Sequence, residues 1–457
     1  MGNRDTRSQT DGVSLSRRRF LQAGALGGAA LLTGALGGAP TPAVRKPGPP
    51  NVLLIITDQQ GLDTVSALGC QHLQTPHMDR LVRGGVAFMR SYSADPLCSP
   101  ARSSVFTSRM PSETGVVQND LPIRSDIPNL GHWLGQEGYE TVYAGKWHLP
   151  GAFVTEMPGF RVIPCGVGGQ GNVGDSAVSR ACQGYLRNRD RNAPFLLVAS
   201  FVQPHDVCQW VGMHRTAPDE LPYPEIAHEL PPLPANFAYD EREPRKLSNT
   251  QRPKWTERQW RYYLWSYYRL VEMVDAEVGR VLQALADWGE PENTIVILTA
   301  DHGEGRGRHQ MVLKNYLYDE AARVPLVVSG PGRVPEGKLN RTHLVSGVDV
   351  TPTICDFAGV PAPPGVVGRS LRPLLEGQSV EWREFVAAEV QHTGRMVRTA
   401  QYKYVMYEGD PVEQLFDMRA DPGETRNLAA EGKHAEVLEA HRRLLREWEV
   451  RLDKARV

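Results

Sequence analysis

Lysine is scarce in this sequence, and so is any excess of one charge. Only nine of the 51 basic residues are lysine, and the formal net charge is −1 at pH 7. A balanced charge excludes the broad basic surface that binds nucleic acid or anionic lipid, so no nucleic-acid partner is expected. Because arginine is the usual cation of this chain, a lysine at a candidate site is more informative, since a compact ammonium differs chemically from a guanidinium.

Cysteines that lie close together in the sequence are also missing. The six cysteines are scattered without the spacing of a zinc-binding motif, and none precedes Cys70. This spacing argues against a zinc knuckle, and the lack of an early cysteine argues against a lipoprotein anchor. If Cys98 has a chemical role, five cysteines remain and at least one of them must be unpaired. The sequence leaves the disulfide pairing open.

A long, strongly apolar run is lacking at the N-terminus. Residues 16–22 read Ser-Arg-Arg-Arg-Phe-Leu-Gln, a twin-arginine export pattern, and a glycine-broken Ala/Gly/Leu stretch occupies residues 23–39. A transmembrane anchor is the alternative, but this stretch is too short and too weakly hydrophobic for one. We expect residues 1–49 to be a signal peptide and linker for the Tat export machinery. The mature protein is then periplasmic or secreted, with no stable membrane anchor.

The remaining chain has the pattern of two packed units. Its length predicts two domains, and 41% apolar and 23% charged residues are typical of a soluble globular protein. Continuous apolar runs alternate with helical stretches, which predicts an α/β domain over residues 50–375 with a mostly parallel sheet sandwiched by helices. The apolar runs lie at residues 51–57, 141–144, 195–201, 294–299 and 324–329.

Three further segments have recognisable patterns. A long helix is predicted from Thr256, with Gln259 completing a capping box, to about Gly289. Residues 204–253 contain nine prolines and predict a surface excursion that rims the pocket. Residues 376–457 predict a smaller α+β subdomain, with short strands at 385–389, 396–399 and 402–406 and a terminal helix at 433–454.

Polar residues follow four of the predicted strands. They form the sets Asp58-Gln59, Lys146-Trp147-His148, His205-Asp206 and Asp301-His302. The carboxyl ends of parallel strands share one edge of a sheet, where ligands bind, so we expect one active site there. Carboxylate, amide and imidazole groups suit a divalent cation. Helix capping is the alternative for either Asp alone, but the two pairs together favour a metal site.

Cys98 is predicted to lie at a helix N-terminus. Pro100 suits the first position of a helix over residues 100–108, with Ser99 as its cap. Backbone N–H groups and the helix dipole favour an anion there, and Arg102 adds a cation one turn on. A buried, inert cysteine is the alternative, but the polar and cationic neighbours favour a reactive one.

In these motifs the chain resembles the formylglycine-dependent sulfatases of the alkaline-phosphatase-like superfamily. Cys98-Ser-Pro-Ala-Arg102 matches their Cys-X-Pro-X-Arg signature, and further blocks follow in the family's order over essentially everything after Pro50. These blocks lie at residues 51–59, 145–148, 300–304, 314–325, 349–359 and 413–428. The resemblance implies a sulfatase-like fold and a hydrolase that cleaves a sulfate ester.

The resemblance also implies roles for particular residues. A formylglycine-generating enzyme would convert Cys98 to formylglycine (3-oxoalanine), whose hydrate attacks sulfur. The modified residue 98 would bind a divalent metal, calcium with manganese or zinc as alternatives, together with Asp58, Gln59, Asp301 and His302. Arg102 and Lys146 would hold the diol and sulfate oxygens. His148 would be the base that helps to expel sulfate, and Lys314 and His205 would contact the sulfate and protonate the leaving oxygen.

The chain departs from the commonest pattern at two ligands. Many sulfatases have Asp in place of Gln59 and Asn in place of His302, and this pair resembles relatives that act on choline sulfate or phosphonate monoesters. A phosphonate monoester or phosphodiester hydrolase is therefore the alternative activity. A catalytically silent carbohydrate-binding homologue is a further alternative, which the complete set of motif residues disfavours.

The substrate is expected to be a sulfated small molecule or carbohydrate. Trp147, Trp210, Arg306 and Arg308 are candidates for recognising an anionic or carbohydrate substrate. His309 falls in a region that lines the pocket in relatives, with a surface-loop histidine as the alternative.

Overall fold

A large sheet forms the centre of the structure. The computed structural model describes residues 48–150, 154–165, 170–215, 224–248 and 252–455, so the expected signal peptide lies outside the described residues except at its last two positions. Residues 47–457 belong to one compact unit. In sheet order the strands are β5 (Arg161–Val162), β4 (Glu140–Gly145), β6 (Phe195–Pro204), β1 (Asn51–Asp58), β7 (Thr294–Ala300), β8 (Leu326–Ser329), β2 (Gly85–Phe88) and β9 (Lys338–Asn340).

The sheet is mostly parallel, as predicted, but one of the expected strands runs the other way. β8 is antiparallel to both β7 and β2. Its residues are buried on both faces, as in the parallel strands. Burial on both faces produces the same apolar run in either direction, so the sequence pattern does not reveal the orientation.

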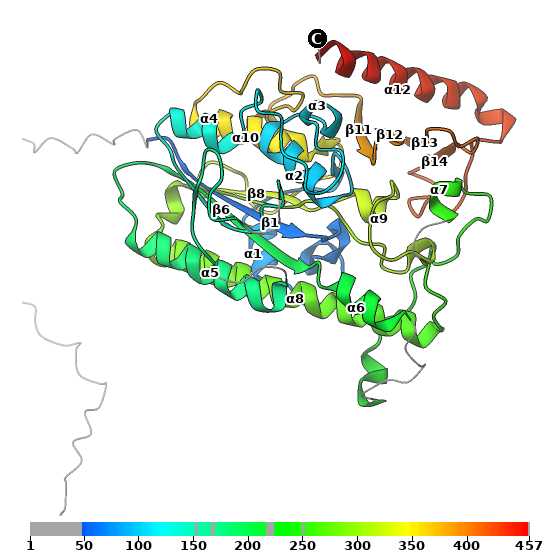
Figure 1. Cartoon of the computed structure of the whole chain (residues 1–457), viewed down its shortest axis with the longest axis horizontal. Coiled ribbons are helices and arrows are strands. Elements are labelled where there is room, and N and C mark those ends of the chain that lie inside the picture. Colours follow the sequence, from blue (N-terminus) through cyan, green and yellow to red (C-terminus); the bar gives the residue numbers. More distant parts are fainter. Residues whose placement is uncertain (1–47, 151–153, 166–169, 216–223, 249–251, 456–457) are drawn as a thin grey trace, which may run out of the picture. The chain divides into compact units, whose positions relative to one another are not determined.

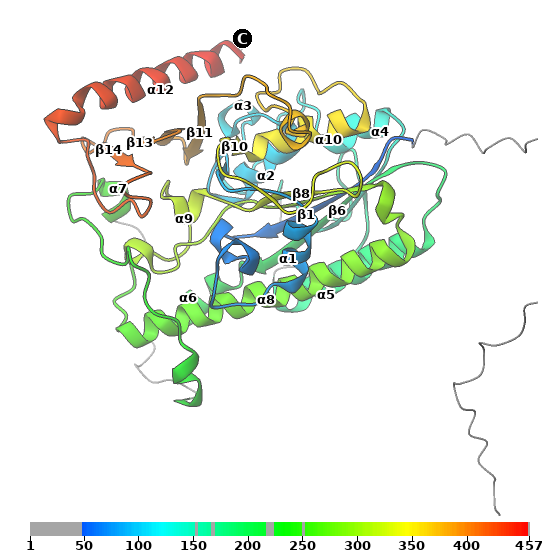
Figure 2. The ribbon, with the colours of Figure 1, turned by 180° about the vertical axis from the view of Figure 1, so that it is seen from behind.

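Helices cover both faces of the sheet (Figures 1 and 2), with α5 and α8 on one face and α2, α4 and α10 on the other. They are α1 (Pro76–Arg83), α2 (Cys98–Thr107), α3 (Pro111–Thr114), α4 (Leu130–Gln136), α5 (Gly171–Asn188), α6 (Val207–His214), α7 (Arg245–Ser248), α8 (Glu257–Trp288), α9 (Asp319–Ala322), α10 (Val350–Ala358), α11 (Arg372–Leu375) and α12 (Ala435–Ala455). Short 3₁₀ turns lie at Leu62–Thr64, Ser66–Leu68, Pro224–Glu229, Pro291–Asn293, Arg308–Gln310, Gly347–Asp349 and Gly432–His434.

Strand β1 shows why both faces are covered. Alternate side chains of a strand point to opposite faces. Val52 and Leu54 belong to the core under α2, α4 and α10, whereas Leu53 and Ile55 belong to the core under α5 and α8. All four are fully buried, and each such burial contributes about 1.5–3 kcal/mol. The central strands are thereby held rigidly between two helical layers.

The predicted capping box of α8 is present, whereas the predicted start of α2 is wrong. The Thr256 side chain accepts the backbone N–H of Gln259, and the Gln259 side-chain oxygen accepts the backbone N–H of Thr256. Helix α2 begins at Cys98 rather than Pro100, and its N-cap is Leu97, not Ser99. Ser99 lies within the helix, where its backbone N–H donates to a side chain from a distant loop.

The C-terminal region contains a small antiparallel sheet, as predicted, with one strand more than expected. Its order is β11 (Phe385–Val390), β12 (Gly394–Thr399), β13 (Tyr402–Tyr407) and β14 (Gln414–Asp417). Helix α12 packs on one face of this sheet. Two strands of two residues, β3 (Ser91–Tyr92) and β10 (Val345–Ser346), pair separately. The boundary between residues 375 and 376 stays a prediction.

Candidate active site

The predicted site residues come from four neighbouring strands. β4, β6, β1 and β7 lie side by side and parallel, so their carboxyl ends share one edge of the sheet. Asp58 is the last residue of β1. Lys146, His205 and Asp301 directly follow β4, β6 and β7. The structure therefore brings these strand ends together, as the alternation of strands and helices predicted.

Four side chains face one another at this edge. One ligand atom each from Asp58, Cys98, Asp301 and His302 lies within 4.8 Å of the others, and all four residues are buried. Cys98 Sγ is 3.2 Å from His302 Nε2 and 3.8 Å from Asp58 Oδ1. His302 Nδ1 is 2.9 Å from the carbonyl oxygen of Gly303. An N–H at Nδ1 bonded to this carbonyl leaves the Nε2 lone pair directed at the cluster.

Two cations hold the outer carboxylate oxygens of this cluster. Arg102 donates from Nη2 to Asp58 Oδ2 and from Nε to Asp301 Oδ2, both at 3.0 Å. Lys146 Nζ lies 2.7 Å from the same Asp58 oxygen. Arg102 is fully buried, and Nη1 donates to the Lys146 carbonyl and to Ser200 Oγ, both at 2.8 Å. Arg102 thus binds the Oδ2 atom of both carboxylates, and their Oδ1 atoms lie on the side of Cys98 and His302.

The pKa values of the two carboxyls are driven apart. Burial raises the pKa of Asp58, but Lys146, His205 and Arg102 outweigh it and hold that pKa well below its usual value. Burial and the neighbouring Asp58 carboxylate raise the pKa of Asp301 to about 6. Two repelling carboxylates beside an imidazole and residue 98 form a donor set that fits a divalent cation, whose charge offsets this repulsion.

Gln59 lies beside the cluster with a strained backbone. Its φ is 71°, and its backbone N–H donates to Asp301 Oδ1 at 3.0 Å. Its amide nitrogen donates to Glu304, and its amide oxygen accepts from Lys314 Nζ. Cys208 Sγ lies 3.3 Å from the same amide oxygen. The structure therefore joins Gln59 and Lys314 directly.

Cys208 is a site residue that the sequence analysis did not single out. Its sulfur is also 3.7 Å from Lys314 Nζ. The only signal in the sequence is its place three residues after His205, in the first turn after β6.

Burial and the cations Lys314 and Lys146 lower the pKa of His205. The Asp58 carboxylate and a hydrogen bond with Cys208 outweigh them and raise it to about 9.

His148 lies in the loop after β4, beside the first turn of α2. Its φ is 66°, a left-handed conformation, and its Nε2 lies 3.5 Å from Asp120 Oδ1. Its carbonyl oxygen accepts from Ser99 Oγ, next to Cys98 in the chain. Left-handed backbone at residues other than glycine is uncommon and concentrates at functional sites.

The two tryptophans proposed as substrate contacts pack against other side chains of the protein. Trp147 is 3% exposed and packs on Phe106, with ring centroids 5.2 Å apart. Its indole N–H donates to the Leu149 carbonyl at 2.6 Å. The expectation for Trp147 is therefore wrong, because an apolar core covers its ring. Trp210 is partly buried and stacks on His214 at 4.0 Å.

Arg306 and His309 are also internal. Arg306 is 2% exposed and pairs with Asp63 at 2.5 Å, so it is not a substrate contact. Arg308, which is partly exposed, binds the second oxygen of Asp63 at 2.5 Å. His309 is 2% exposed and stacks on Tyr318, with ring centroids 3.9 Å apart, so it is not a surface-loop histidine. Burial and nearby cations lower the pKa of His309 to about 3.

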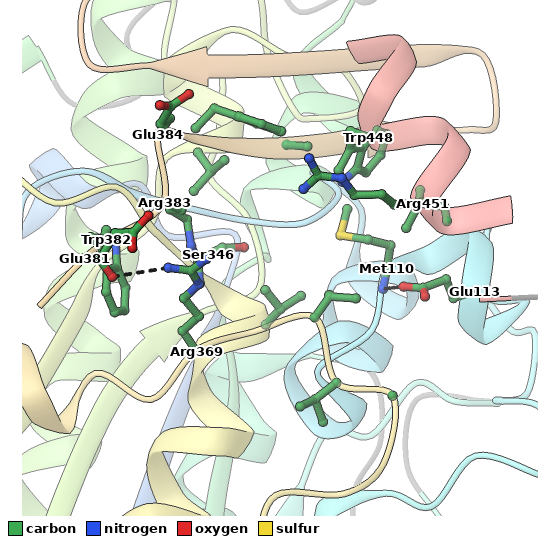
Figure 3. Close-up of a pocket in the computed structure, with 18 residues that line it drawn as sticks. Met110, Glu113, Ser346, Arg369, Glu381, Trp382, Arg383, Glu384, Trp448 and Arg451 are labelled. Atoms are coloured by element: carbon green, nitrogen blue, oxygen red, sulfur yellow. Dashed lines mark hydrogen bonds between the residues drawn. The ribbon is translucent and has the colours of Figure 1, made fainter. Parts of the chain in front are cut away.

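A separate cavity of 590 Å³ lies near the C-terminal helix (Figure 3). Trp448 and Arg451 of α12 form one wall, and Arg369 and Trp382 lie on the other side. Arg369 donates to the carbonyl oxygen of Glu381 at 3.4 Å. The cavity also touches residues just beyond the C-terminal end of α2, whereas Cys98 begins that helix. A helix of this length spans about 15 Å, so the cavity is separate from the Cys98 site.

Comparison with known proteins gives consistent results. A family model named Sulfatase matches residues 50–360, and one named N-sulphoglucosamine sulphohydrolase, C-terminal, matches residues 307–451. A Delta 4,5-hexuronate-2-O-sulfatase from Bacteroides thetaiotaomicron is 33% identical over 450 residues, covering 91% of each chain.

Two solved structures have a similar fold. A protein from Bacteroides thetaiotaomicron assigned to the sulfatases superposes with a TM-score of 0.78 at 30% identity, covering 89% of this chain and 93% of that one. A phosphonate monoester hydrolase from Agrobacterium radiobacter gives a TM-score of 0.75 at 25% identity, covering 88% and 96%. With a family model over most of its length and this degree of identity, the chain belongs to the sulfatase family of sulfuric ester hydrolases.

Proposed function

We propose that this protein hydrolyses a sulfate ester carried by a saccharide. The observation that carries the proposal is the meeting of Cys98 with Asp58, Asp301 and His302 at the first turn of α2. The N–H groups at a helix start favour an anion such as sulfate, and the buried cations around the cluster add to that preference. The saccharide is proposed from the relative named as a hexuronate-2-O-sulfatase.

The proposal includes two groups that the family uses. Formylglycine, made from Cys98 by a formylglycine-generating enzyme, supplies as its hydrate the hydroxyl that attacks sulfur. A divalent cation held by Asp58, Gln59, Asp301 and His302 supplies positive charge to the reacting oxygens. We propose calcium, with manganese and zinc as alternatives to be decided by metal analysis of the purified protein.

The residues around this centre have distinct proposed roles. Arg102 fixes the two carboxylates, and Lys146 and Lys314 offset the charge of the sulfuryl group in the transition state. His205, with its pKa raised to about 9, is protonated at neutral pH and donates a proton to the departing alcohol oxygen. His148 accepts a proton in the step that releases sulfate.

The experiment is a substrate screen with protein coexpressed with a formylglycine-generating enzyme. Sulfated mono- and oligosaccharides, choline sulfate and 4-nitrophenyl sulfate are compared, with C98A as the inactive control. Mass spectrometry of the peptide containing residue 98 measures its conversion. We expect sulfate release from at least one sulfated saccharide; release only from choline sulfate or the aryl ester would reject the saccharide proposal.

A second candidate is hydrolysis of a phosphonate monoester or phosphodiester at the same centre. The similarity to a phosphonate monoester hydrolase favours it. The same preparation is therefore assayed with 4-nitrophenyl phenylphosphonate beside 4-nitrophenyl sulfate. A clear preference for the phosphorus ester would overturn the sulfatase proposal.

We also propose twin-arginine export to the periplasm or the medium, after modification in the cytoplasm. Among the residues that the structure describes, no helix is both long enough and apolar enough to cross a membrane. The test is replacement of Arg17 and Arg18 by lysine, followed by cell fractionation. Retention of this variant in the cytoplasm is expected, and unchanged export would contradict the proposal.

A further inference from the structure

Ser99, the residue after Cys98, ties two distant loops together. Its hydroxyl donates to the carbonyl oxygen of His148 and accepts the backbone N–H of Asp120 at 3.2 Å. Its own backbone N–H donates to Asn119 Oδ1 at 3.0 Å. One side chain in the first turn of α2 thus binds both the turn at Asn119 and Asp120 and the loop that carries His148.

Both of the residues joined by Ser99 have a left-handed backbone. The φ of Asp120 is 65° and that of His148 is 66°. Such a conformation is strained at a residue other than glycine, and it persists only where surrounding contacts impose it. Ser99 contacts the backbone of both residues, so its hydroxyl is one of the contacts that maintain this geometry.

The bridge places a carboxylate beside the imidazole. His148 Nε2 lies 3.5 Å from Asp120 Oδ1. The other ring nitrogen, Nδ1, is buried and has no hydrogen-bond partner within the part of the chain that the structure describes. A neutral imidazole with its hydrogen on Nε2, directed at Asp120, carries its lone pair on Nδ1. The Asp120 carboxylate on the Nε2 side favours the tautomer with its hydrogen on Nε2, in which Nδ1 is the atom that accepts a proton.

We propose that Ser99 and Asp120 are positioning residues for His148. Ser99 sets the backbone from which the ring projects, and Asp120 holds the hydrogen on Nε2 so that Nδ1 is the proton-accepting atom. A histidine base oriented by a third group is a recurring catalytic arrangement. The inference rests on the proposed function, in which His148 is the base.

A double-mutant cycle tests whether Asp120 acts through His148. D120A is expected to lower kcat about tenfold with little change in KM, less than the 10²–10⁴-fold that a general base contributes. In an H148A background, D120A is expected to have no further effect, because the group it positions is gone. An equal effect in both backgrounds, or wild-type kcat in D120A, would overturn the inference.

Matched variants separate positioning from folding. D120E keeps the carboxylate and is expected to recover part of the lost rate, whereas D126A alters an exposed carboxylate nearby and is expected to leave kcat unchanged. S99A is expected to resemble D120A, and S99T to retain activity through its hydroxyl. Because residue 99 adjoins the modified position, each rate is divided by the converted fraction from mass spectrometry. An S99A rate equal to that of wild type would remove Ser99 from the proposal.

A second measurement does not depend on activity. In protein labelled with [¹⁵N]histidine, the signal absent from H148A identifies His148, and its nitrogen shifts report the tautomer. We expect the Nε2–H form in wild type and a mixture in D120A. An identical His148 signal in both proteins would overturn the inference. If D120A changes the tautomer as expected but the wild-type protein has no sulfatase activity, the proposed function alone would be overturned.

Discussion

Cys98 Sγ lies 3.2 Å from His302 Nε2, although the two residues are separated by 204 positions in the sequence. The imidazole is oriented from behind, since its Nδ1 lies 2.9 Å from the Gly303 carbonyl oxygen. Cys98 is buried, and burial and the Asp58 carboxylate raise the pKa of its thiol. The cations Lys146 and Lys314, with His302, outweigh both and bring that pKa well below the usual value. The pocket therefore favours an anionic group at residue 98.

Replacing Arg102 by alanine is expected to destabilise the fold. Arg102 pairs with Asp58 and Asp301 where all three side chains are fully buried, so its removal takes the guanidinium from Asp301 and leaves Asp58 with Lys146 alone. Breaking such a pair costs about 3–5 kcal/mol. Urea unfolding of R102A measures this loss. The control is R124A, whose pair with Asp126 is exposed, and its unfolding midpoint is expected to stay unchanged. An R102A midpoint equal to that of wild type would contradict the prediction.

Two glycines with similar backbones distinguish strain from crowding. Gly145 has φ 105° and Gly138 has φ 86°. A Cβ at Gly145 would lie 1.9 Å from the Ser200 carbonyl oxygen, whereas nothing lies within 4 Å of one at Gly138. G138A is expected to lose only the conformational cost, about 1–2 kcal/mol. G145A is expected to lose more, because the Ser200 carbonyl that accepts the Lys146 N–H must move. Equal unfolding midpoints for the two variants would count against this explanation.

The stability of the protein is expected to fall as the pH rises from about 5 to 8. Burial and the neighbouring Glu424 raise the pKa of Glu320 to about 8. The folded state therefore binds this proton more tightly than the unfolded state. The destabilisation is absent below the ordinary glutamate pKa, grows with pH, and is complete above about pH 8, with a slope of up to about 1.4 kcal/mol per pH unit.

The variant E320Q tests this pH dependence. It removes the titrating group, so its unfolding free energy is expected to change less between pH 5 and pH 8 than that of wild type. Urea unfolding at several pH values measures the difference. E137Q, which alters an exposed glutamate, is expected to keep the wild-type slope. A wild-type slope in E320Q would show that other groups govern the pH dependence.

Lys314 is expected to matter for turnover rather than for folding. Its ammonium contacts the amide oxygen of Gln59 and lies 3.7 Å from Cys208 Sγ, at the edge of the metal-ligand cluster. Loss of one positioned cation in the transition state lowers kcat/KM by about 10²–10³-fold. K314A is measured on whichever sulfate ester proves best, with K338A, an exposed lysine on β9, as the control. A fall of less than threefold would contradict the proposed role.

The sequence predicted the strand ends well, because the pattern that reveals them is local. A buried strand is an apolar run, and the polar residue that ends it is visible in the sequence, as at Asp58 and Asp301. The orientation of β8 was not predictable, since a strand buried on both faces has the same composition in either direction. The cap of α2 was missed because Asn119, from a separate loop, accepts the N–H of Ser99.

The sequence by itself determined the elements whose cause lies within a few residues. The capping box between Thr256 and Gln259 is of this kind, and so is the helix start beside Cys98, although it was misplaced by two residues. Only the tertiary structure decided which buried charges meet. Arg306 reaches Asp63 across 243 positions, and Arg102 reaches Asp301 across 199. A buried charge must find a partner wherever the packed strands place one, and that choice leaves no local trace in the sequence.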